Sequence, residues 1–179
     1  MSAANIVRYF TPHETTIGTL MIVASPRGLQ RIGLLKANEK SEDFLKQHYG
    51  ESAASIVPLS GFFTTVCAAI DSYLSDGSAL KLPIDLCGGT PLQRAVWFKI
   101  ATIPHGQTIS YSELAAKVGF PRAVRAVASA CAANPIPLII PCHRVVAKDG
   151  TPGGFSLGGL RIKETLLALE ASASSSQAA

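Results

Sequence analysis

The sequence predicts an α/β protein with a small N-terminal lobe, built from a sheet plus a helix, and a mostly helical C-terminal lobe with a helix-turn-helix. Strand-like runs lie near the N-terminus, whereas helical periodicity dominates the later half. A polar, glycine-rich stretch near residues 78–90 separates the two. We therefore expect an N-terminal α/β lobe at residues 1–85, a C-terminal lobe at 86–171 and a disordered tail at 172–179.

The N-terminal half shows two strands and one helix. Residues 17–24 (IGTLMIVA) and 29–35 have the pattern of strands, and the turn signal SPRG at 25–28 joins them. Apolar residues at helical spacing across 60–74 predict a helix with one buried face.

The C-terminal half contains two helix starts whose caps are visible in the sequence. Thr90 caps the first helix, Pro91 suits its first position, and Gln93 completes a capping box. Ser110 and Glu113 form a second capping box. Each helix then carries apolar side chains on one face, so each has a face to bury.

A helix-turn-helix is predicted in the same half. The helix that starts at Ser110 ends at a turn around Gly119, and a second helix runs from about 122 to 133 until Pro135 stops it. Two short helices joined by a tight turn resemble a helix-turn-helix. A last helix is expected at about 161–171.

Composition and charge exclude several classes of protein. With 47% hydrophobic and 16% charged residues, the chain can bury a core and is not expected to be disordered. Lys and Arg outnumber Asp and Glu by 16 to 12, which permits a nucleic-acid partner without requiring one. No apolar run approaches the ~18 residues of a membrane span. The N-terminus shows no secretory signal. We therefore expect no membrane partner and a reducing compartment, the cytoplasm or a eukaryotic nucleus.

The cysteines do not suggest a metal site. The four cysteines form no C-x-x-C pair, so we expect neither a zinc site nor a redox motif, and no cofactor. They are Cys67, Cys87, Cys131 and Cys142.

The most informative stretch is residues 135–146, PIPLIIPCHRVV. An apolar approach leads to Cys142, and His143 and Arg144 follow it directly. A cysteine is a nucleophile only as the thiolate, which a nearby base or positive group favours. The pattern alone favours an inert, buried cysteine over a nucleophile. Adjacent side chains of an extended chain also point to opposite sides, so contact between Cys142 and His143 requires a bend or a bridging water.

On this stretch and four others, the sequence resembles the O6-alkylguanine-DNA alkyltransferases, also called methylated-DNA–protein-cysteine methyltransferases. The similar segments cover about half of the chain, in the family's order and spacing, whereas the N-terminal half is similar only in general pattern. The segments are GTPLQRAVW (89–97), IPHGQTISYSELA (103–115), VRAVASACAANP (124–135), PCHRVV (141–146) and GGL…KETLLALE (158–170).

The resemblance implies an irreversible reaction that moves an alkyl group from O6 of guanine in DNA to Cys142. It implies that His143 deprotonates this cysteine through a water, and that Glu170 orients the histidine. Asn134 resembles the hinge residue that fixes the turn before the cysteine. Each of these groups favours the thiolate. Without the resemblance, Glu170 can also be explained as a solvated charge near the C-terminus of the last expected helix. The helix dipole disfavours a negative charge at that position, which favours a specific partner for Glu170.

The resemblance also implies a DNA-binding surface and a base pocket. Tyr111 matches the tyrosine beside the target base, and Arg125 matches the arginine that fills the gap left by the flipped nucleotide. Without the resemblance, a tyrosine packed on the core is the favoured explanation of Tyr111, and a surface arginine on a helix is the alternative explanation of Arg125. The small side chains around Arg125 fit minor-groove binding without base preference. Arg122, Ala126 and Ser129 complete the DNA-binding set, and the pocket set is Val145, Phe155, Ser156, Cys131 and Pro137.

Three features depart from the family's pattern. Phe155 stands where a tyrosine is common, and the loop 155–160 (FSLGGL) is one residue longer than the shortest family loops. Cys131 stands where other members carry a larger apolar residue. These differences bear on the range of substrates more than on the type of reaction.

The sequence therefore predicts a single-turnover DNA repair methyltransferase that acts as a monomer on double-stranded DNA carrying O6-alkylguanine, after flipping the nucleotide from a minor-groove complex. The alternative is a DNA-binding regulator that uses the helix-turn-helix, with Cys142 as an alkylation sensor. The sequence contains none of the additional N-terminal metal-binding cysteines of such regulators. A cysteine hydrolase is disfavoured because the Cys–His spacing does not match protease patterns. A non-catalytic lesion-binding relative would carry another residue at position 142.

Overall fold

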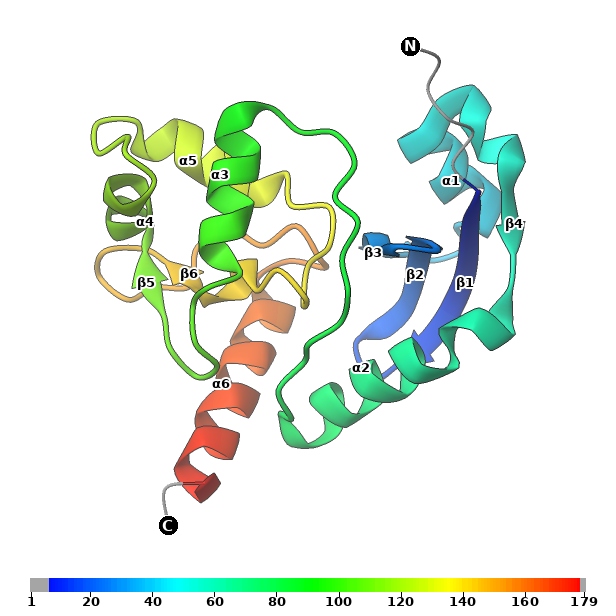
Figure 1. The fold of residues 1–179 in the computed structure, drawn as a ribbon. Coiled ribbons are helices and arrows are strands. Elements are labelled where there is room, and N and C mark those ends of the chain that lie inside the picture. Colours follow the sequence, from blue (N-terminus) through cyan, green and yellow to red (C-terminus); the bar gives the residue numbers. More distant parts are fainter. Residues whose placement is uncertain (1–6, 178–179) are drawn as a thin grey trace.

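The computed structural model describes residues 7–177 of the chain. Figure 1 shows a sheet with flanking helices formed by the N-terminal part, a group of helices formed by the C-terminal part, and an extended linker between them. The linker, residues 77–90, connects the end of α2 (Thr64–Asp76) to the start of α3 (Pro91–Ile100). The predicted fold class, a mixed α/β protein with a small N-terminal sheet and a helical C-terminal part, is confirmed.

The N-terminal sheet has four strands in the order β3-β2-β1-β4. β1 (Arg8–Thr15), β2 (Gly18–Ser25) and β3 (Gly28–Leu34) are consecutive and antiparallel, and the short β4 (Ile56–Pro58) pairs parallel to β1. The two strands predicted from the sequence correspond to β2 and β3 within a residue at each end, and the turn between them is present.

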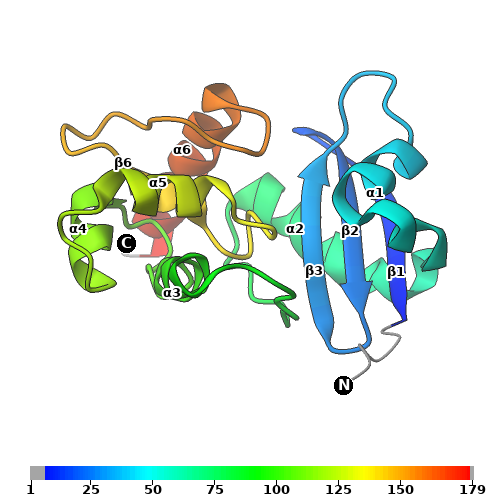
Figure 2. The ribbon, with the colours of Figure 1, turned by 90° about the horizontal axis from the view of Figure 1, so that it is seen from above.

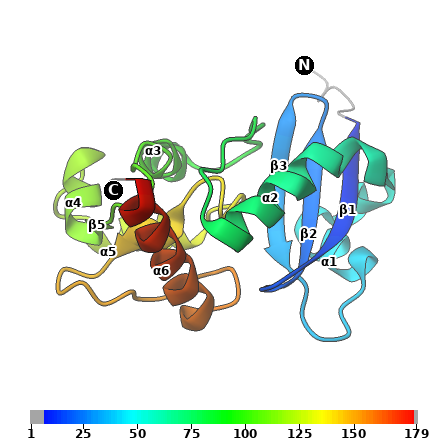
Figure 3. The ribbon, with the colours of Figure 1, turned by 90° about the horizontal axis from the view of Figure 1, so that it is seen from below.

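Helices cover both faces of this sheet (Figures 2 and 3). On one face, α1 (Ser41–Tyr49) and the 3-10 helix η1 (Gly50–Ser55) cover Met21 and Val23. On the other face, alternate side chains of β2 join a larger core with α2, which follows the short 3-10 helix η2 (Ser60–Phe63). This alternation follows the two-residue period of a strand.

The C-terminal part is built mainly from four helices. The two predicted capping boxes are both present, at Thr90 before α3 and at Ser110 before α4. The helix-turn-helix is formed by α4 and α5, with Gly119 in the turn at a φ of 86°. In chain order, the elements of the whole C-terminal part are α3, β5 (Ile109–Ser110), α4 (Tyr111–Lys117), α5 (Val124–Ala132), the 3-10 helix η3 (Cys142–Arg144), β6 (Val145–Val146) and α6 (Leu160–Gln177). The strand β6 pairs parallel to β5.

Backbone hydrogen bonds tie the two parts together along the edge strand β3. The linker runs beside it, where Leu29 N–H donates to the carbonyl of Pro83 at 2.9 Å. Ile32 N–H donates to the carbonyl of Pro135 at 2.9 Å. Pro135 lies in the turn that leads to Cys142, so the sheet holds the segment that carries the predicted acceptor.

The C-terminal helix is longer than predicted. We expected residues 172–179 to lack structure, but α6 continues to Gln177, so that expectation is wrong for 172–177, and residues 178–179 lie outside the described part. Tertiary packing explains the difference, because Ala173 lies against Gly77 at the end of α2, where an added Cβ would come within 2.9 Å of it. A serine-rich sequence does not reveal such support, since most helical stability comes from packing.

Candidate functional site

The site begins with the turn that carries Cys142. The Asn134 side chain bridges this turn: its Nδ2 donates to the carbonyl of Ile140 at 2.7 Å and to Cys142 Sγ at 3.1 Å, while its Oδ1 accepts from Ile136 N–H at 3.0 Å. Leu138 adopts a φ of 75°, a left-handed conformation that is rare for a leucine. The 3-10 helix η3 then starts at Cys142, which supplies the bend between Cys142 and His143.

The environment of Cys142 favours its thiolate. The side chain is 3% exposed. A hydrogen bond from the Cys131 thiol is the largest influence and lowers the pKa of Cys142; burial opposes it, and Asn134 and Lys163 add to the lowering. The same interaction, together with burial, raises the pKa of Cys131. Of the two neighbouring thiols, Cys142 is therefore the one that ionises first.

Glu170 lies at the centre of a buried polar cluster. Its carboxylate accepts from Arg144 Nε at 2.8 Å and Nη2 at 2.9 Å, from Tyr73 Oη at 2.8 Å and from the Gly106 N–H at 3.1 Å. It also lies 2.8 Å from His143 Nε2. Burial alone would raise the pKa of Glu170, but the hydrogen bonds from His143 and Arg144 outweigh it and hold this pKa well below its usual range. Glu170 is therefore an acceptor only.

This arrangement determines which nitrogen of His143 carries the proton. A deprotonated carboxylate cannot donate, so His143 Nε2 must carry the hydrogen of the 2.8 Å bond. Burial lowers the pKa of His143 despite the opposing influence of Glu170, so the ring is neutral at pH 7. In a neutral ring with Nε2–H, Nδ1 is the basic nitrogen. That atom is buried and has no hydrogen-bond partner among the described residues.

Sequence reasoning missed two members of the site and the function of a third. Lys163 is fully buried, and its Nζ donates to the carbonyl of Val145 at 2.6 Å. It shares a helix face with Leu166 and Glu170, so a charged residue at core spacing was the available signal. Tyr73 looked like an ordinary core residue of α2, and Arg144 looked like a positive neighbour of the cysteine rather than the partner of Glu170.

A small cavity lies beside Cys142. Its volume is about 20 Å³, enough for a single water-sized molecule. Four predicted pocket or site residues line it with Cys142, whereas Pro137 and Val145 do not; Pro137 lines a neighbouring cleft with Ser156. The lining residues are Tyr111, Cys131, Ala132, Cys142, Gly154, Phe155 and Ser156. Phe155 also meets the His143 ring edge to face, with centroids 6.2 Å apart.

Tyr111 stands at the start of α4 and at the wall of this cavity. Burial first, and then the two neighbouring thiols, raise its pKa to about 12. The phenol therefore keeps its proton at neutral pH and is able to donate it in a hydrogen bond.

The predicted DNA-binding residues lie on the exposed side of the helix-turn-helix. Arg125, Ala126 and Ser129 of α5 are exposed, as is Arg122 just before it, whereas Val127 is fully buried on the opposite side of the helix. Helical spacing places Arg125, Ala126 and Ser129 on one face of α5, and Arg122 lies in the turn before this helix.

Two further features bear on the class of protein. Within residues 7–177, no group of three His, Cys, Asp or Glu side chains is arranged to hold a metal ion. No helix among these residues is long and apolar enough to cross a membrane.

Comparisons with known proteins identify the family of the chain. Residues 91–172 match the family model of the 6-O-methylguanine DNA methyltransferase DNA-binding domain. The chain is 36% identical to the methylated-DNA–protein-cysteine methyltransferase of Methanosarcina barkeri, covering 90% of this chain and 96% of that protein. It is 40% identical to the Escherichia coli bifunctional transcriptional activator/DNA repair enzyme Ada, over 93% of this chain but 46% of that protein.

Solved structures agree as well. The crystal structure of the Mycobacterium tuberculosis O6-methylguanine methyltransferase superposes with a TM-score of 0.74 at 32% identity, covering 92% of this chain and 93% of that one. A structure of the M. tuberculosis protein in complex with DNA superposes with a TM-score of 0.73 at 31% identity, covering 93% of both chains.

The fold and the site define a DNA repair alkyltransferase, an enzyme that binds DNA. The chain belongs to the methylated-DNA–protein-cysteine methyltransferase family.

Proposed function

We propose that this protein removes an alkyl group from O6 of guanine in double-stranded DNA by transferring it to Sγ of Cys142, once per molecule. The observation that carries the proposal is a buried cysteine with a lowered pKa at the wall of a cavity, held by the Asn134 turn and followed by the His143–Glu170 pair. The exposed arginines of the helix-turn-helix support DNA as the partner.

The transfer is an in-line displacement. The thiolate of Cys142 attacks the alkyl carbon, an S–C bond forms, and the C–O6 bond breaks with its electron pair moving onto guanine. The product is a thioether, which water does not cleave. Because this bond is stable to hydrolysis, each protein molecule reacts once in this proposal.

His143 takes the thiol proton in this proposal. Its Nδ1 is the basic nitrogen and has no partner among the described residues, which supports a water between Nδ1 and Cys142 Sγ. Glu170 keeps the Nε2 proton in place and stabilises the imidazolium that forms. Arg144 and Tyr73 hold the carboxylate, so the acceptor atom does not rotate away.

Tyr111 assists the departing base. Guanine leaves with negative charge, and a phenol that remains protonated at neutral pH is a suitable donor toward N3 of the purine. Ser156 and the carbonyls of Cys142 and Val145 supply hydrogen bonds that recognise guanine. Lys163 already donates to the Val145 carbonyl and orients it.

Because the cavity beside Cys142 is buried and small, we propose that the target nucleotide flips out of the duplex and that a loop of the protein moves to admit it. A carbon inside a stacked duplex is out of reach of a buried thiolate, so the nucleotide must leave the stack at a cost of about a few kcal/mol. The present cavity of about 20 Å³ is too small for a purine. We propose that the loop around Gly154 and Phe155 shifts outward, while Arg125 fills the gap in the duplex and Arg122, Ala126 and Ser129 contact the minor-groove side.

Mass spectrometry tests this reaction. The protein is incubated with duplex DNA carrying one O6-methylguanine, and we expect a single added methyl group on the peptide that contains Cys142. The Cys142→Ser variant should bind the same duplex and accept nothing, whereas Cys67→Ser, which changes a half-buried cysteine of α2, should react like the wild type. Methylation of another cysteine, or repair of more than one equivalent of DNA, would contradict the proposal.

The alternative function, a DNA-binding regulator with Cys142 as an alkylation sensor, has less support. The chain matches the Escherichia coli activator and repair enzyme over less than half of that protein's length. If Cys142 were a sensor, alkylation would change the affinity for a specific DNA sequence. We propose instead a monomer without sequence preference, for which light scattering and binding to unrelated duplexes are the measurements.

A further inference from the structure

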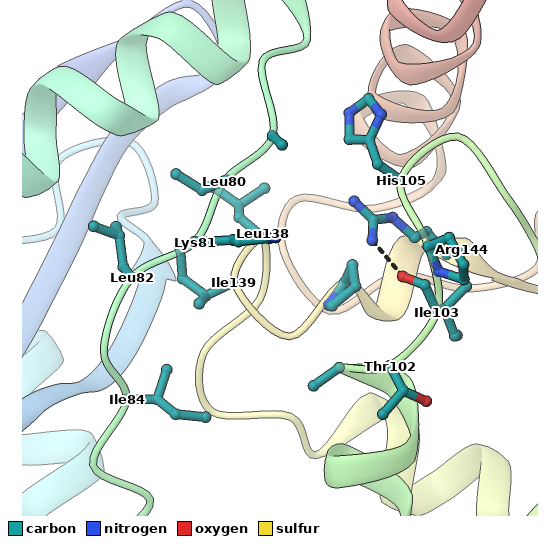
Figure 4. Close-up of a pocket in the computed structure, with 14 residues that line it drawn as sticks. Leu80, Lys81, Leu82, Ile84, Thr102, Ile103, His105, Leu138, Ile139 and Arg144 are labelled. Carbon is teal, nitrogen blue, oxygen red and sulfur yellow. Dashed lines mark hydrogen bonds between the residues drawn. The ribbon is translucent and has the colours of Figure 1, made fainter.

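A second and much larger cavity lies between the linker and the C-terminal helices, away from the pocket of Cys142. Its volume is about 520 Å³, which is within the usual range for small-molecule sites. Figure 4 shows side chains of the linker on one side, with Ile103, His105 and Arg144 across from them. Neither Cys142 nor Tyr111 lines this cavity, so it is distinct from the alkyl-acceptor pocket.

The polar side chains that line this cavity are Lys81, Thr102, His105 and Arg144, all of which are able to donate hydrogen bonds. Arg144 has five N–H groups, of which Glu170 and the Ile103 carbonyl use three, so one hydrogen on each of Nη1 and Nη2 has no partner among the described residues. His105 Nε2 is buried and likewise has no partner there. Lys81 extends its ammonium toward the cavity from the linker (Figure 4). None of the residues that line the cavity is an Asp or Glu.

The linker and the turn that leads to Cys142 also contribute an apolar part of the lining. Five aliphatic side chains form it, three from the linker and two from the turn that leads to Cys142. They are Leu80, Leu82, Ile84, Leu138 and Ile139.

The geometry points to a binding site for a small organic anion with one carboxylate or phosphate head and a short apolar tail. Guanidinium donors match the oxygens of both head groups, and the Lys81 ammonium adds positive charge that Glu170 does not neutralise. An acceptor beside His105 Nε2 would satisfy a buried polar atom that is costly to leave unpaired. The aliphatic wall fits a tail of several carbons.

Isothermal titration of the full chain with hexanoate, hexyl phosphate and hexan-1-ol tests this site. We expect saturable one-to-one binding of at least one of the two anions, and the stronger of them identifies the head group. Hexan-1-ol, which has the tail without the charge, should bind at least tenfold more weakly, because it cannot form hydrogen bonds between a charged head group and the Arg144 and Lys81 donors.

Two variants locate the site. Lys81→Met and His105→Leu should each weaken binding of the anion by about tenfold. Lys36→Met removes an exposed lysine from the loop between β3 and α1 and should bind like the wild type. Lys81 is exposed, so its variant is expected to fold and carries the test if His105→Leu does not.

Three results would overturn the inference: no saturable binding of either anion, equal binding of hexan-1-ol, or unchanged binding by Lys81→Met. These measurements do not involve alkyl transfer, so their outcome tests the anion site independently of the proposed function.

Discussion

Two buried regions of this molecule are stabilised by different interactions. The buried cluster under α1 consists of the apolar residues Met21, Val23, Phe44, Leu45 and Ile56. The region beside α6 contains an ion pair, a neutral histidine and a tyrosine hydroxyl that are joined by hydrogen bonds of 2.8–3.2 Å. Lys163 lies in the same region and donates to the Val145 carbonyl at 2.6 Å.

The two regions should respond differently to substitution. An apolar core loses stability in proportion to the volume removed, and neighbours adjust partly. A buried polar network depends on every member, because removing one partner leaves another charge or donor unsatisfied. The region beside α6 is therefore costly to maintain, which is consistent with the role that we propose for it in the chemistry of Cys142.

Replacement of Glu170 should have the largest effect. Glu170→Gln leaves Arg144 buried with its charge uncompensated, so we expect a loss of about 3–5 kcal/mol in the free energy of unfolding. Urea denaturation measures this loss. Glu164→Gln, an exposed position of the same helix, is the matched control and should change stability by less than about 0.5 kcal/mol. Equal losses in the two variants would remove the distinction between the regions.

A truncation in the apolar region should have the next largest effect. Leu45→Ala removes a side chain that is 3% exposed and should cost about 3 kcal/mol in stability. The rate of methyl transfer by the folded protein should not change. Leu59→Ala, at a position 42% exposed, provides the control in both assays. A slower transfer in the Leu45 variant would show that the two regions are coupled.

Loss of the Tyr73 hydroxyl tests the contribution of the N-terminal lobe to the polar region. Tyr73→Phe removes the 2.8 Å hydrogen bond to Glu170. We expect the free energy of unfolding to fall by about 2 kcal/mol, which is typical of a hydrogen bond to a charged group. Thermal or urea unfolding measures it. Tyr9→Phe is the control, because it removes a hydroxyl from a tyrosine whose ring packs on Phe62, outside the polar region. An unchanged Tyr73 variant would show that Arg144 alone holds the carboxylate.

Acidification should produce the smallest effect. The folded pKa of Glu170 lies well below its ordinary value of 4.5, so its contribution is present above pH 4.5 and is lost as the pH falls below that value. The stability difference between wild type and Glu170→Gln should therefore shrink by at most about 1.4 kcal/mol for each pH unit below 4.5. A difference that stays constant or grows in acid would contradict the assigned charge of Glu170.

The sequence predicted those parts of the fold that local signals determine. The capping boxes at Thr90 and Ser110 and the strands on either side of the 25–28 turn are present where expected. The strand at 8–15 and the helix at 41–49 were not predicted, and the extension of α6 depends on packing against Gly77.

In the candidate site, too, the sequence did not predict contacts between residues that are far apart in the chain. The acceptor segment and the pairing of His143 with Glu170 followed from the family resemblance, and the structure brings these residues together. Tyr73 was not predicted because it comes from another lobe, and no spacing rule links it to Glu170. The influence of Cys131 on the pKa of Cys142 depends on the three-dimensional path of the turn and has no signature in the sequence.

Glu170 belongs to the last helix of the described chain, whereas the groups it organises come before it. Because a ribosome delivers a polypeptide from its N-terminus, the sulfur, the imidazole and the guanidinium emerge earlier than the carboxylate that connects them. A nascent chain that has not yet folded α6 against η3 has a histidine with no carboxylate to fix its tautomer. On the proposed mechanism, reactivity toward alkyl groups is therefore acquired only after α6 has been synthesised and has packed against η3.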